Sequence, residues 1–482
     1  MNIFYEMASR LGFYKDVKNC LLKGFTPCAV TGVSNIHKAQ TAMALSRLSP
    51  CLVICDDEAS AIRMTGDINE MAGEQLACVF PAKDLNFAYM EGVSREYEHK
   101  RLEALSLITQ GKCKIIAASM EACLQGTIPQ DKLKEFSFEI KTGGELSLEE
   151  LTNKLLAGGY TRTDQVEGQA QFSVRGSIAD IFPVQESRPV RIELWGDEVD
   201  SISYFDPESQ RRTDPIDEIM VFPALEIIFP DTDDLVAKLE ALSKSVRGSR
   251  TDKIRTNISR DIETAQSGIT LTNLDKHYTV CYDKLTTVFD YFESGVCLVS
   301  EYTNCIEKGK AALAQLSEDM KLLYEDGILF RKLEGFYLDI PQAELKITQM
   351  KSVFLDSFMR SNNGVKFKKL TNPAGRQTAA WGGNIINLEE ELKNLCSQGY
   401  CTVVLAGSEK TLPIINKDLN DAGISAEILT EDSEIIKGKV YLRTGCLSGG
   451  FDYPDIGCAA ITQMKAMSAK KRKSRHKAGE EI

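Results

Sequence analysis

The sequence predicts a multidomain α/β protein, in which parallel sheets covered by helices accompany an inserted α+β domain with an antiparallel sheet. Three observations support this prediction. The chain has 482 residues, which is too long for a single core, so three or four domains are expected. Short apolar runs alternate with helical patterns over residues 1–125, whereas residues 166–225 alternate apolar and polar side chains at a period of two.

The first region is predicted to be a parallel sheet with helices packed on it. Strands are expected at residues 28–31, 51–55, 77–80 and 114–118, and helices at 36–47, 57–71 and 94–109. Such alternation is typical of parallel sheets, because each crossover between parallel strands needs a long connection, usually a helix.

Residues 166–225 predict a small antiparallel sheet with one buried face. Apolar residues such as Phe172 and Val174 are expected on its inner face. The other face carries charged residues, which are Arg175, Arg191, Glu193, Asp197 and Glu198. Fixed charges on a rigid sheet suit a protein docking surface better than a catalytic pocket. An ordinary solvated sheet face is the alternative interpretation of the same pattern.

Further α/β structure is predicted over residues 213–345 and 346–465. Residues 248–269 are polar and predict a loop, residues 278–282 alternate as a strand does, and residues 295–301 are an apolar run typical of a buried strand. A small α/β domain with a strand at 401–405 is expected at the end of this region.

Composition argues against several functions. The net charge of −12 disfavours wrapping of nucleic acid, which needs clustered Lys and Arg. The 14 cysteines form no C-x-x-C pair and there are only four histidines, so no zinc site is expected. No apolar run is long enough for a membrane span and no signal peptide is evident, so a cytoplasmic protein is expected.

The first turn from strand to helix has part of a phosphate-binding pattern. The motif G-x-x-x-x-G-K-[ST] aligns with residues 32–39, where Gly32 and Lys38 fit but His37 and Ala39 do not. A side chain at the second glycine position crowds the phosphate cradle, and a methyl group cannot bind Mg²⁺. This suggests a degenerate site that does not hydrolyse ATP. An unrelated turn with a chance lysine is the alternative.

The order of residues from 172 to 211 resembles a known family. The segments are FSVRGSIADIFP at 172–183, PVRIE at 189–193, GDEV at 196–199 and FDPESQR at 205–211. They resemble the bacterial transcription-repair coupling factors (Mfd) and their relative, the excision-repair protein UvrB. The resemblance implies a UvrB-like fold, with degenerate helicase-type parallel-sheet domains of the P-loop class around the antiparallel-sheet domain.

The resemblance also implies a partner, because in both relatives the small domain binds UvrA. By position, the arginines that contact UvrA are Arg162 and Arg175, which would pair with carboxylates, and Glu193 would pair with a cation. The predicted UvrA-binding residues, including two that would add apolar area, are Arg162, Arg175, Ile181, Phe182 and Glu193. UvrB has F-R-V-R where this chain has Ser173 in place of the first arginine, so one contact is lost.

The resemblance assigns a second motif, also degenerate, to the same nucleotide site. The resemblance puts a P-loop at residues 32–39 of UvrB, and an Asp-Glu pair that holds Mg²⁺ at the end of the strand matching 295–301. This chain has Ser300 and Glu301 there, and Mg²⁺ prefers anionic oxygen. We therefore expect no catalytic residues, metal or cofactor in this chain, although full-length family members use ATP and Mg²⁺ for DNA translocation.

The predicted division of the chain follows the family. The expected parts are a UvrB-like domain with the degenerate P-loop at 1–125, the UvrA-binding domain at 126–212, a second UvrB-like domain at 213–345, a third domain at 346–465 and a basic linker at 466–482. The family's RNA polymerase-binding domain and DNA translocase are not in this sequence. We therefore expect a fragment from the N-terminal part of a longer protein.

The expected function is that of an adaptor that recruits UvrA to stalled RNA polymerase for DNA repair. A UvrB-type DNA-dependent ATPase is the alternative. It would need a glycine at position 37, a hydroxyl at 39, an aspartate at 300 and an aromatic-rich hairpin between residues 81 and 94. A free-standing structural scaffold is a third possibility that the pattern leaves open.

Overall fold

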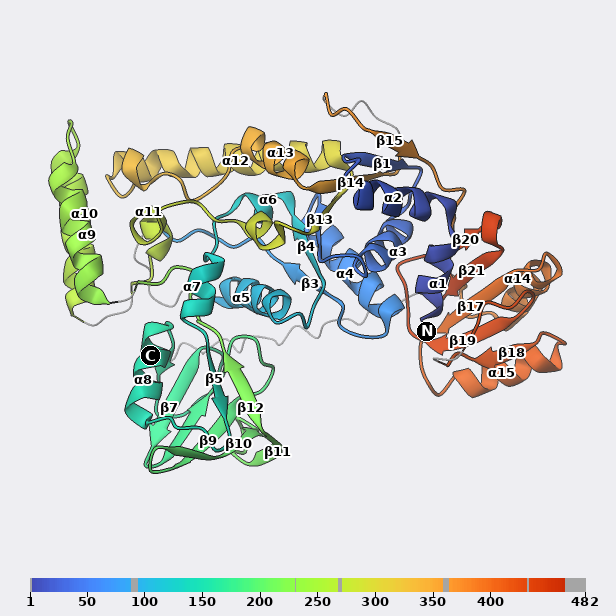
Figure 1. Cartoon of the computed structure of the whole chain (residues 1–482), viewed down its shortest axis with the longest axis horizontal. Coiled ribbons are helices and arrows are strands. Elements are labelled where there is room, and N and C mark those ends of the chain that lie inside the picture. The colour runs from blue at the N-terminus through green and yellow to red at the C-terminus, as the bar shows by residue number, and fades with distance from the viewer. Residues whose placement is uncertain are drawn as a thin grey trace, which may run out of the picture. The chain divides into compact units, whose positions relative to one another are not determined.

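The computed structural model describes residues 2–87, 94–229, 231–267, 271–358, 364–430 and 433–463. The predicted basic linker at 466–482 lies outside the described residues. The chain forms two compact units (Figure 1). The larger unit is residues 8–373, and the smaller unit joins residues 1–7 to residues 374–482.

The larger unit is built on a seven-stranded sheet with the strand order β15–β1–β14–β13–β2–β4–β3, in which all neighbours are parallel. The strands are β1 (Cys28–Thr31), β2 (Cys51–Cys55), β3 (Ala77–Phe80), β4 (Ile115–Ser119), β13 (Val296–Ser300), β14 (Lys351–Asp356) and β15 (Lys369–Thr371). Strands β2, β4 and β13 are buried throughout, which explains their continuous apolar sequences. The predicted parallel sheet is confirmed.

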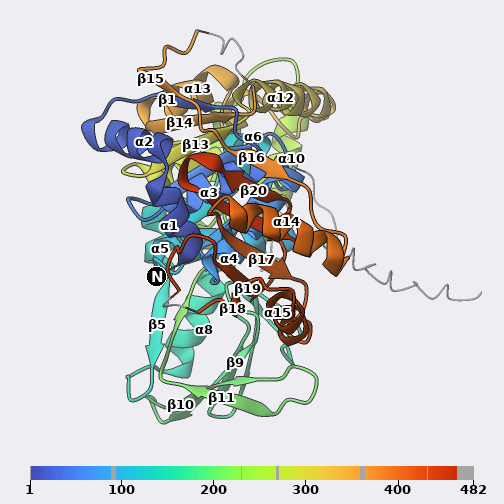
Figure 2. The same ribbon diagram turned by 90° about the vertical axis from the view of Figure 1, so that its right-hand side faces the viewer.

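Helices accompany this sheet in the larger unit; α12 and α13 lie side by side in both views, whereas α9 and α10 pack on each other away from the sheet (Figures 1 and 2). The helices are α2 (Gly12–Lys23), α3 (Asn35–Leu45), α4 (Glu58–Ala72), α5 (Glu96–Thr109), α6 (Met120–Leu124), α7 (Gln130–Glu135), α9 (Thr232–Ser245), α10 (Thr251–Gln266), α11 (Tyr278–Cys281), α12 (Tyr302–Glu325) and α13 (Ile340–Gln349), with the 3-10 turns η1 (Leu274–His277), η2 (Val288–Phe292) and η3 (Arg331–Leu333).

The strand order differs from the predicted division of the chain. Strand β13 comes from the predicted domain 213–345, yet it pairs with β2 of the first region. Strand β14 lies beyond the predicted boundary at residue 346, yet it pairs with both β1 and β13. An apolar run predicts that a strand is buried, but it carries no information about which distant strand lies beside it. The other predicted boundaries stay predictions.

Two segments of the larger unit have a different secondary structure from the predicted one. The predicted loop at 248–269 contains helix α10, whose Ile254 and Ile258 are buried as a narrow stripe in a polar sequence. The predicted strand at 278–282 is the short helix α11. Tyr278 and Tyr282 are both buried with their ring centroids 5.2 Å apart, as expected for positions i and i+4 of a helical turn.

The antiparallel sheet of the same unit has the strand order β11–β10–β9–β8–β7–β6. The strands are β6 (Thr161–Arg162), β7 (Gln171–Arg175), β8 (Ile178–Ile181), β9 (Val190–Trp195), β10 (Glu198–Phe205) and β11 (Arg212–Ile216). The predicted meander is confirmed, because β7 to β11 pair antiparallel in sequence order. Strand β6 is added in parallel to β7.

Two further elements complete this region. Helix α8 (Leu148–Ala157) begins after Ser147, which accepts a hydrogen bond from the amide of Glu150 at 3.1 Å. Strand β5 (Phe138–Lys141) pairs with β12 (Glu218–Val221). The region therefore continues beyond residue 212, where the prediction ended it.

The smaller unit has a six-stranded mixed sheet with the order β16–β20–β21–β17–β19–β18, and α14 and α15 lie beside it (Figure 2). Phe4 of α1 packs near Phe451 in this unit, with ring centroids 6.3 Å apart. The elements are α1 (Ile3–Arg10, of which residues 3–7 belong here), β16 (Arg376–Thr378), α14 (Ile385–Ser397), β17 (Cys401–Ala406), α15 (Leu412–Asp421), β18 (Ala426–Ile428), β19 (Val440–Thr444), β20 (Gly450–Tyr453), η4 (Pro454–Ile456) and β21 (Cys458–Thr462).

Candidate functional site

The antiparallel sheet has an apolar inner face and a charged outer face. Phe172, Ile181 and Val190 lie opposite one another across β7, β8 and β9 and are fully buried. Because side chains alternate along a strand, the neighbouring positions point outward. The strand register gives two outward rows, Arg175–Ile178–Glu193–Ser201 and Ser173–Asp180–Arg191–Ser203. The predicted sharing of one face by Arg175, Arg191 and Glu193 is therefore confirmed.

A single buried carboxylate holds both arginines of this outer face. Asp180 is 1% exposed and accepts hydrogen bonds from Arg191 Nε at 2.7 Å and Nη2 at 2.8 Å. It also accepts one from Arg175 Nη2 at 3.0 Å. Arg191 lies 14% exposed, whereas Arg175 is 54% exposed. The cluster thus carries a net positive charge, and the guanidinium that reaches solvent is already oriented.

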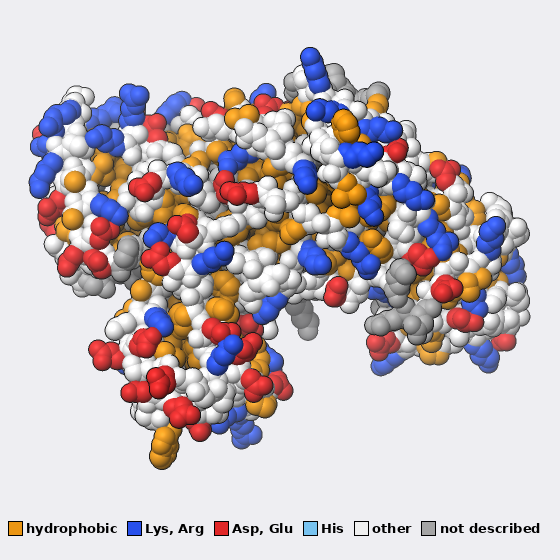
Figure 3. Space-filling view, in the orientation of Figure 1, with side chains coloured by type: hydrophobic (Ala, Val, Ile, Leu, Met, Phe, Trp, Pro, Cys, Tyr) orange, Lys and Arg blue, Asp and Glu red, His pale blue; other side chains and the backbone are white. Residues whose placement is uncertain are grey.

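Glu193 has a partner within the chain. Its carboxylate pairs with Arg212 of β11 and accepts a hydrogen bond of 3.4 Å from Ser201 Oγ. A cation on a binding partner would have to compete with Arg212 for this carboxylate. Acidic and basic side chains are interspersed over the lobe that contains the sheet, at the bottom of Figure 3.

Of the other predicted binding residues, Ile181 and Arg162 do not join this face. Ile181 is fully buried in the core of the sheet, so its prediction as a contact residue is wrong, because its position in the alternation points inward. Phe182 follows the strand and is half-buried. Arg162 is exposed on the edge strand β6, opposite the buried Phe172. Since Phe172 and Arg175 lie on opposite faces, Arg162 and Arg175 leave the sheet on opposite faces as well.

Sequence reasoning missed two residues of the outer face. One is Asp180, which lies inside the quoted string at an outward position between two arginines on neighbouring strands. The other is Trp195, which follows Glu193 by two residues on β9 and is 84% exposed. Both could have been found by carrying the period of two through each strand.

The amides of the degenerate nucleotide turn are not free to cradle a phosphate. Strand β1 ends at Thr31 and α3 begins at Asn35, so His37, Lys38 and Ala39 are helical residues. The amide of Ser34 donates to His37 Nδ1 at 3.4 Å, and the amide of Lys38 donates to Ser34 O at 3.0 Å. Those amides already have acceptors, whereas a P-loop needs them free for phosphate.

At Gly32 the backbone conformation itself favours glycine. Its φ is +77°, and a Cβ at this position would lie 2.9 Å from the side chain of Asn372. The glycine therefore serves the turn and the close approach of Asn372.

Lys38 and Glu301, which the resemblance placed in one site, do meet. Lys38 Nζ lies 2.5 Å from Glu301 Oε1, with the lysine side chain 0% and the glutamate side chain 16% exposed. The same oxygen accepts hydrogen bonds from Ser357 N at 2.9 Å and Ser357 Oγ at 2.5 Å. A carboxylate of the chain thus occupies the place beside Lys38 that a phosphate would need.

The backbone and the charge of Glu301 both reflect this arrangement. Its φ of +58° lies in the left-handed region, which costs a residue with a side chain about 1–2 kcal/mol. Burial works to raise the pKa of Glu301, but the hydrogen bonds from Lys38 and Ser357 and the charge of Lys38 outweigh it and hold the pKa below its ordinary value. The neighbouring Ser300 is buried at the end of β13.

A polar pocket of about 290 Å³ lies beside this ion pair. Its lining includes Asp56, Arg63, Glu301, Asn304 and Ser357. In the described ranges, no group of three or more His, Cys, Asp and Glu side chains is placed to hold a metal ion.

We expect His37 to make the protein less stable in mild acid. Burial lowers the pKa of His37 to about 4, so between pH 6.5 and 4 the unfolded chain binds a proton that the folded chain does not. Lowering the pH from 7 to 5 should cost about 2 kcal/mol of unfolding free energy through this residue. Glutamine at the same helix position keeps an acceptor for the Ser34 amide. In urea unfolding at both pH values, His37→Gln should lose less stability than the wild type, whereas equal losses would contradict this prediction.

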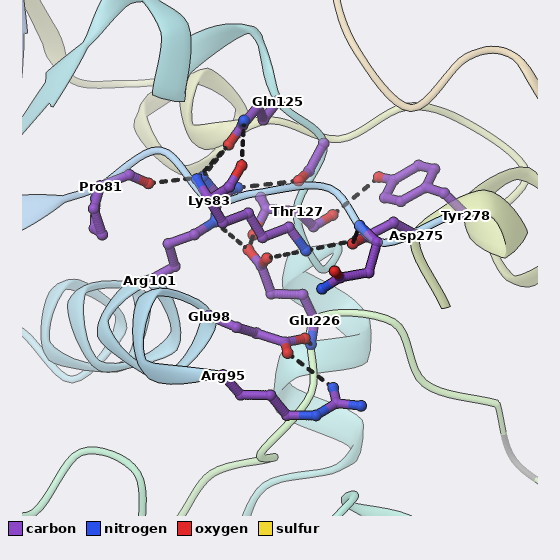
Figure 4. A network of polar contacts seen from close by, with 12 residues as sticks. Pro81, Lys83, Arg95, Glu98, Arg101, Gln125, Thr127, Glu226, Asp275 and Tyr278 are labelled. Carbon is purple, nitrogen blue, oxygen red and sulfur yellow. Dashed lines mark hydrogen bonds and ion pairs between the residues drawn. The ribbon is translucent and has the colours of Figure 1, made fainter. Parts of the chain in front are cut away.

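A second buried network was not predicted, and it joins the end of the antiparallel-sheet region to the parallel sheet (Figure 4). Glu226 is fully buried and pairs with Arg101 Nε at 2.8 Å and Lys83 Nζ at 2.8 Å. Lys83 also pairs with Asp275 at 2.8 Å. Burial works to raise the pKa of Glu226, but Arg101 and Lys83 outweigh it and keep it lowered. These residues come from distant segments, so no local pattern could indicate the network.

Residues 138–226 match the family described as the UvrB interaction domain. The chain is 25% identical to the transcription-repair-coupling factor of Bacillus subtilis over 475 residues, which are 96% of this chain and 40% of the relative. The chain is a relative of the transcription-repair-coupling factors. The coupling factor of Staphylococcus haemolyticus is 25% identical over 464 residues, 92% of this chain and 38% of the relative. The coupling factor of Staphylococcus aureus strain MRSA252 is 22% identical over 471 residues, which are 95% of this chain and 39% of the relative.

The match to the coupling factors covers both compact units, and the UvrB interaction domain match covers the whole outer face and ends at Glu226. The chain spans about two fifths of the length of the coupling factors it matches.

Proposed function

We propose that this chain is the UvrA-recruiting adaptor region of a transcription-repair-coupling factor, acting in the cytoplasm. In the full-length protein it would link removal of stalled RNA polymerase to nucleotide excision repair. RNA polymerase and DNA would be bound by parts of the relatives that this chain does not cover. The observation that carries the proposal is Arg175, held by the buried Asp180 on the outer sheet face, within the segment that matches the UvrB interaction domain.

The mechanism proposed for this face is electrostatic docking. A guanidinium that is fixed before binding loses little conformational freedom when it meets a carboxylate on UvrA. Charge pairs of this kind steer association and select the correct partner. We propose Arg162, on the sheet edge, as a second contact, and Glu193 as a contact that requires a cation of UvrA to displace Arg212.

We also propose that the parallel sheet is a UvrB-like, helicase-type domain of the P-loop class that has lost its nucleotide. The pairing of Lys38 with Glu301 and the short turn before α3 support this proposal over a UvrB-type ATPase. No helix in the described ranges combines the length and the apolar character that a membrane span requires.

Replacing Arg175 with alanine tests the adaptor proposal. The variant should bind UvrA roughly tenfold more weakly, since it loses one charge-assisted contact of about 1.4 kcal/mol. Titration calorimetry with purified UvrA measures the affinity. Arg188→Ala is the matched control, because Arg188 is similarly exposed at 45% and pairs with Asp214 instead of Asp180. Unchanged affinity in Arg175→Ala, with the thermal unfolding midpoint preserved, would overturn the assignment.

A further inference from the structure

We propose that Trp195 is the apolar anchor of the interface with UvrA, inserting into an apolar pocket of the partner beside the contact made by Arg175. This inference rests on the proposed function and adds a residue whose expected contribution to affinity exceeds that of Arg175. Trp195 is 84% exposed, the highest value among the large apolar side chains in the part of the chain that the structure describes. Tryptophan is the residue type most enriched at binding hot spots, together with tyrosine and arginine.

The strand register puts Trp195 on the same outer face as Arg175. Trp195 and Glu193 are two positions apart on β9 and therefore point to the same side, with about 7 Å between them along the strand. Glu193 lies opposite Ile178, which lies opposite Arg175, so two strand spacings of about 10 Å separate Glu193 from Arg175. These distances fit easily within one interface of ordinary size.

The fold itself makes little use of the Trp195 side chain. Within the described ranges, its indole N–H donates no hydrogen bond and its ring has no aromatic or cationic partner. It is opposite Glu198, across the turn formed by Gly196 and Asp197. A large ring held on a short hairpin loses little freedom on binding, and its burial removes a large apolar area from water.

The surroundings define the chemistry of the site on UvrA. Next to the pocket for the indole ring, a carboxylate would face Arg175, whose guanidinium is fixed by Asp180 at 3.0 Å. An acceptor at the rim of the pocket would take the indole N–H. Trp195 thus supplies affinity, whereas the neighbouring charges supply orientation and selectivity.

The chain has only two tryptophans, which allows a direct test. Trp381 is 8% exposed in the smaller unit, so it serves as an internal reference. The chain is labelled with 5-fluorotryptophan, its two ¹⁹F resonances are assigned with Trp381→Phe, and unlabelled UvrA is added. The Trp195 resonance should shift and lose its sensitivity to exchange of H₂O for D₂O, whereas the Trp381 resonance should stay unchanged.

The affinity of Trp195→Ala for UvrA, measured by calorimetry, completes the test. We expect a loss of roughly 30-fold, typical of a hot-spot residue. Leu156→Ala is the matched control, because Leu156 is a 51% exposed apolar residue of α8 in the same lobe, and its affinity should be unchanged. Both variants should keep the unfolding midpoint of the wild type, since neither side chain is in the core.

The outcomes separate this inference from the proposed function. If the wild type binds UvrA and Arg175→Ala weakens it, but Trp195→Ala binds normally and the Trp195 resonance stays exposed, the anchor is overturned and the adaptor stands. If the wild type does not bind UvrA at all, both are overturned. A shifted Trp195 resonance together with weakened binding by Trp195→Ala supports the anchor.

Discussion

Replacing Glu226 with alanine is expected to lower the free energy of unfolding by about 3–5 kcal/mol, because it leaves the buried Arg101 without its counter-charge and Lys83 with Asp275 alone. Arg101 is completely buried and Lys83 is 7% exposed. Arg101 keeps hydrogen bonds to Pro81 O at 3.0 Å and Gly126 O at 3.0 Å, but these neutral acceptors cannot replace a carboxylate. Urea unfolding of the full chain measures the loss.

The control for this variant is a glutamate in an exposed ion pair. Glu318 pairs with Lys321, and the two side chains are 66% and 62% exposed, so Glu318→Ala should cost less than about 1 kcal/mol. A loss below about 1 kcal/mol in Glu226→Ala would show that water or neighbouring groups satisfy Arg101 and Lys83. That result would contradict the stabilising role given to the ion pairs of Glu226 with Arg101 and Lys83.

The second large effect is expected at the degenerate nucleotide turn. Glu301→Ala removes the counter-charge of the fully buried Lys38, and the loss of unfolding free energy should again be about 3–5 kcal/mol. The double variant Lys38→Met/Glu301→Leu should be more stable than Glu301→Ala, because it removes both charges and fills the space with apolar groups. Urea unfolding of the three proteins measures the difference.

Inorganic phosphate gives this experiment a second measurement. If Glu301 occupies the place of a phosphate beside Lys38, then millimolar phosphate should raise the unfolding midpoint of Glu301→Ala and leave that of the wild type unchanged. Equal stability of Glu301→Ala and the wild type would contradict the role given to this ion pair, and so would a wild-type midpoint that responds to phosphate.

Local periodicity predicted the parts of the fold that depend on neighbouring residues. The alternation around Phe172 and Val190 placed the inner face of the antiparallel sheet, and the same period puts Arg175 and Glu193 on its outer face. The same period points Ile181 into the core, so the alternation excludes a contact residue that the resemblance alone suggests. The buried stripe of Ile254 and Ile258 was missed because it is narrow and the residues around it are polar.

Contacts between distant segments divide into two kinds. The meeting of Lys38 and Glu301 was expected, because a resemblance linked two motifs that the sequence separates by 263 positions. The contacts of Glu226 with Arg101 and Lys83 belong to no motif, and a single charged residue after a strand gives no sign of burial. Asp180 escapes prediction for a different reason. The exposed arginines by themselves account for the charged outer face, and only the structure shows that a buried carboxylate orients them.

The rigid sheet and the closed nucleotide turn give the proposed adaptor a consistent physical basis. Ion pairs on the outer face are formed before the partner arrives, and the ion pair at Lys38 needs no nucleotide. Binding by the outer face would therefore not depend on ATP.

Calorimetric titration of UvrA with the wild-type chain and with Arg175→Glu, each with and without ATP, tests the central claim most directly. We expect saturable binding of the wild type that weakens as salt rises and that reversal of the charge at position 175 abolishes. A further titration with Lys38→Met should show the same dependence on ATP as the wild type, since Lys38 binds no nucleotide in this account. Absence of binding by the wild type, or equal affinity of Arg175→Glu, would contradict a UvrA-recruiting role for this face.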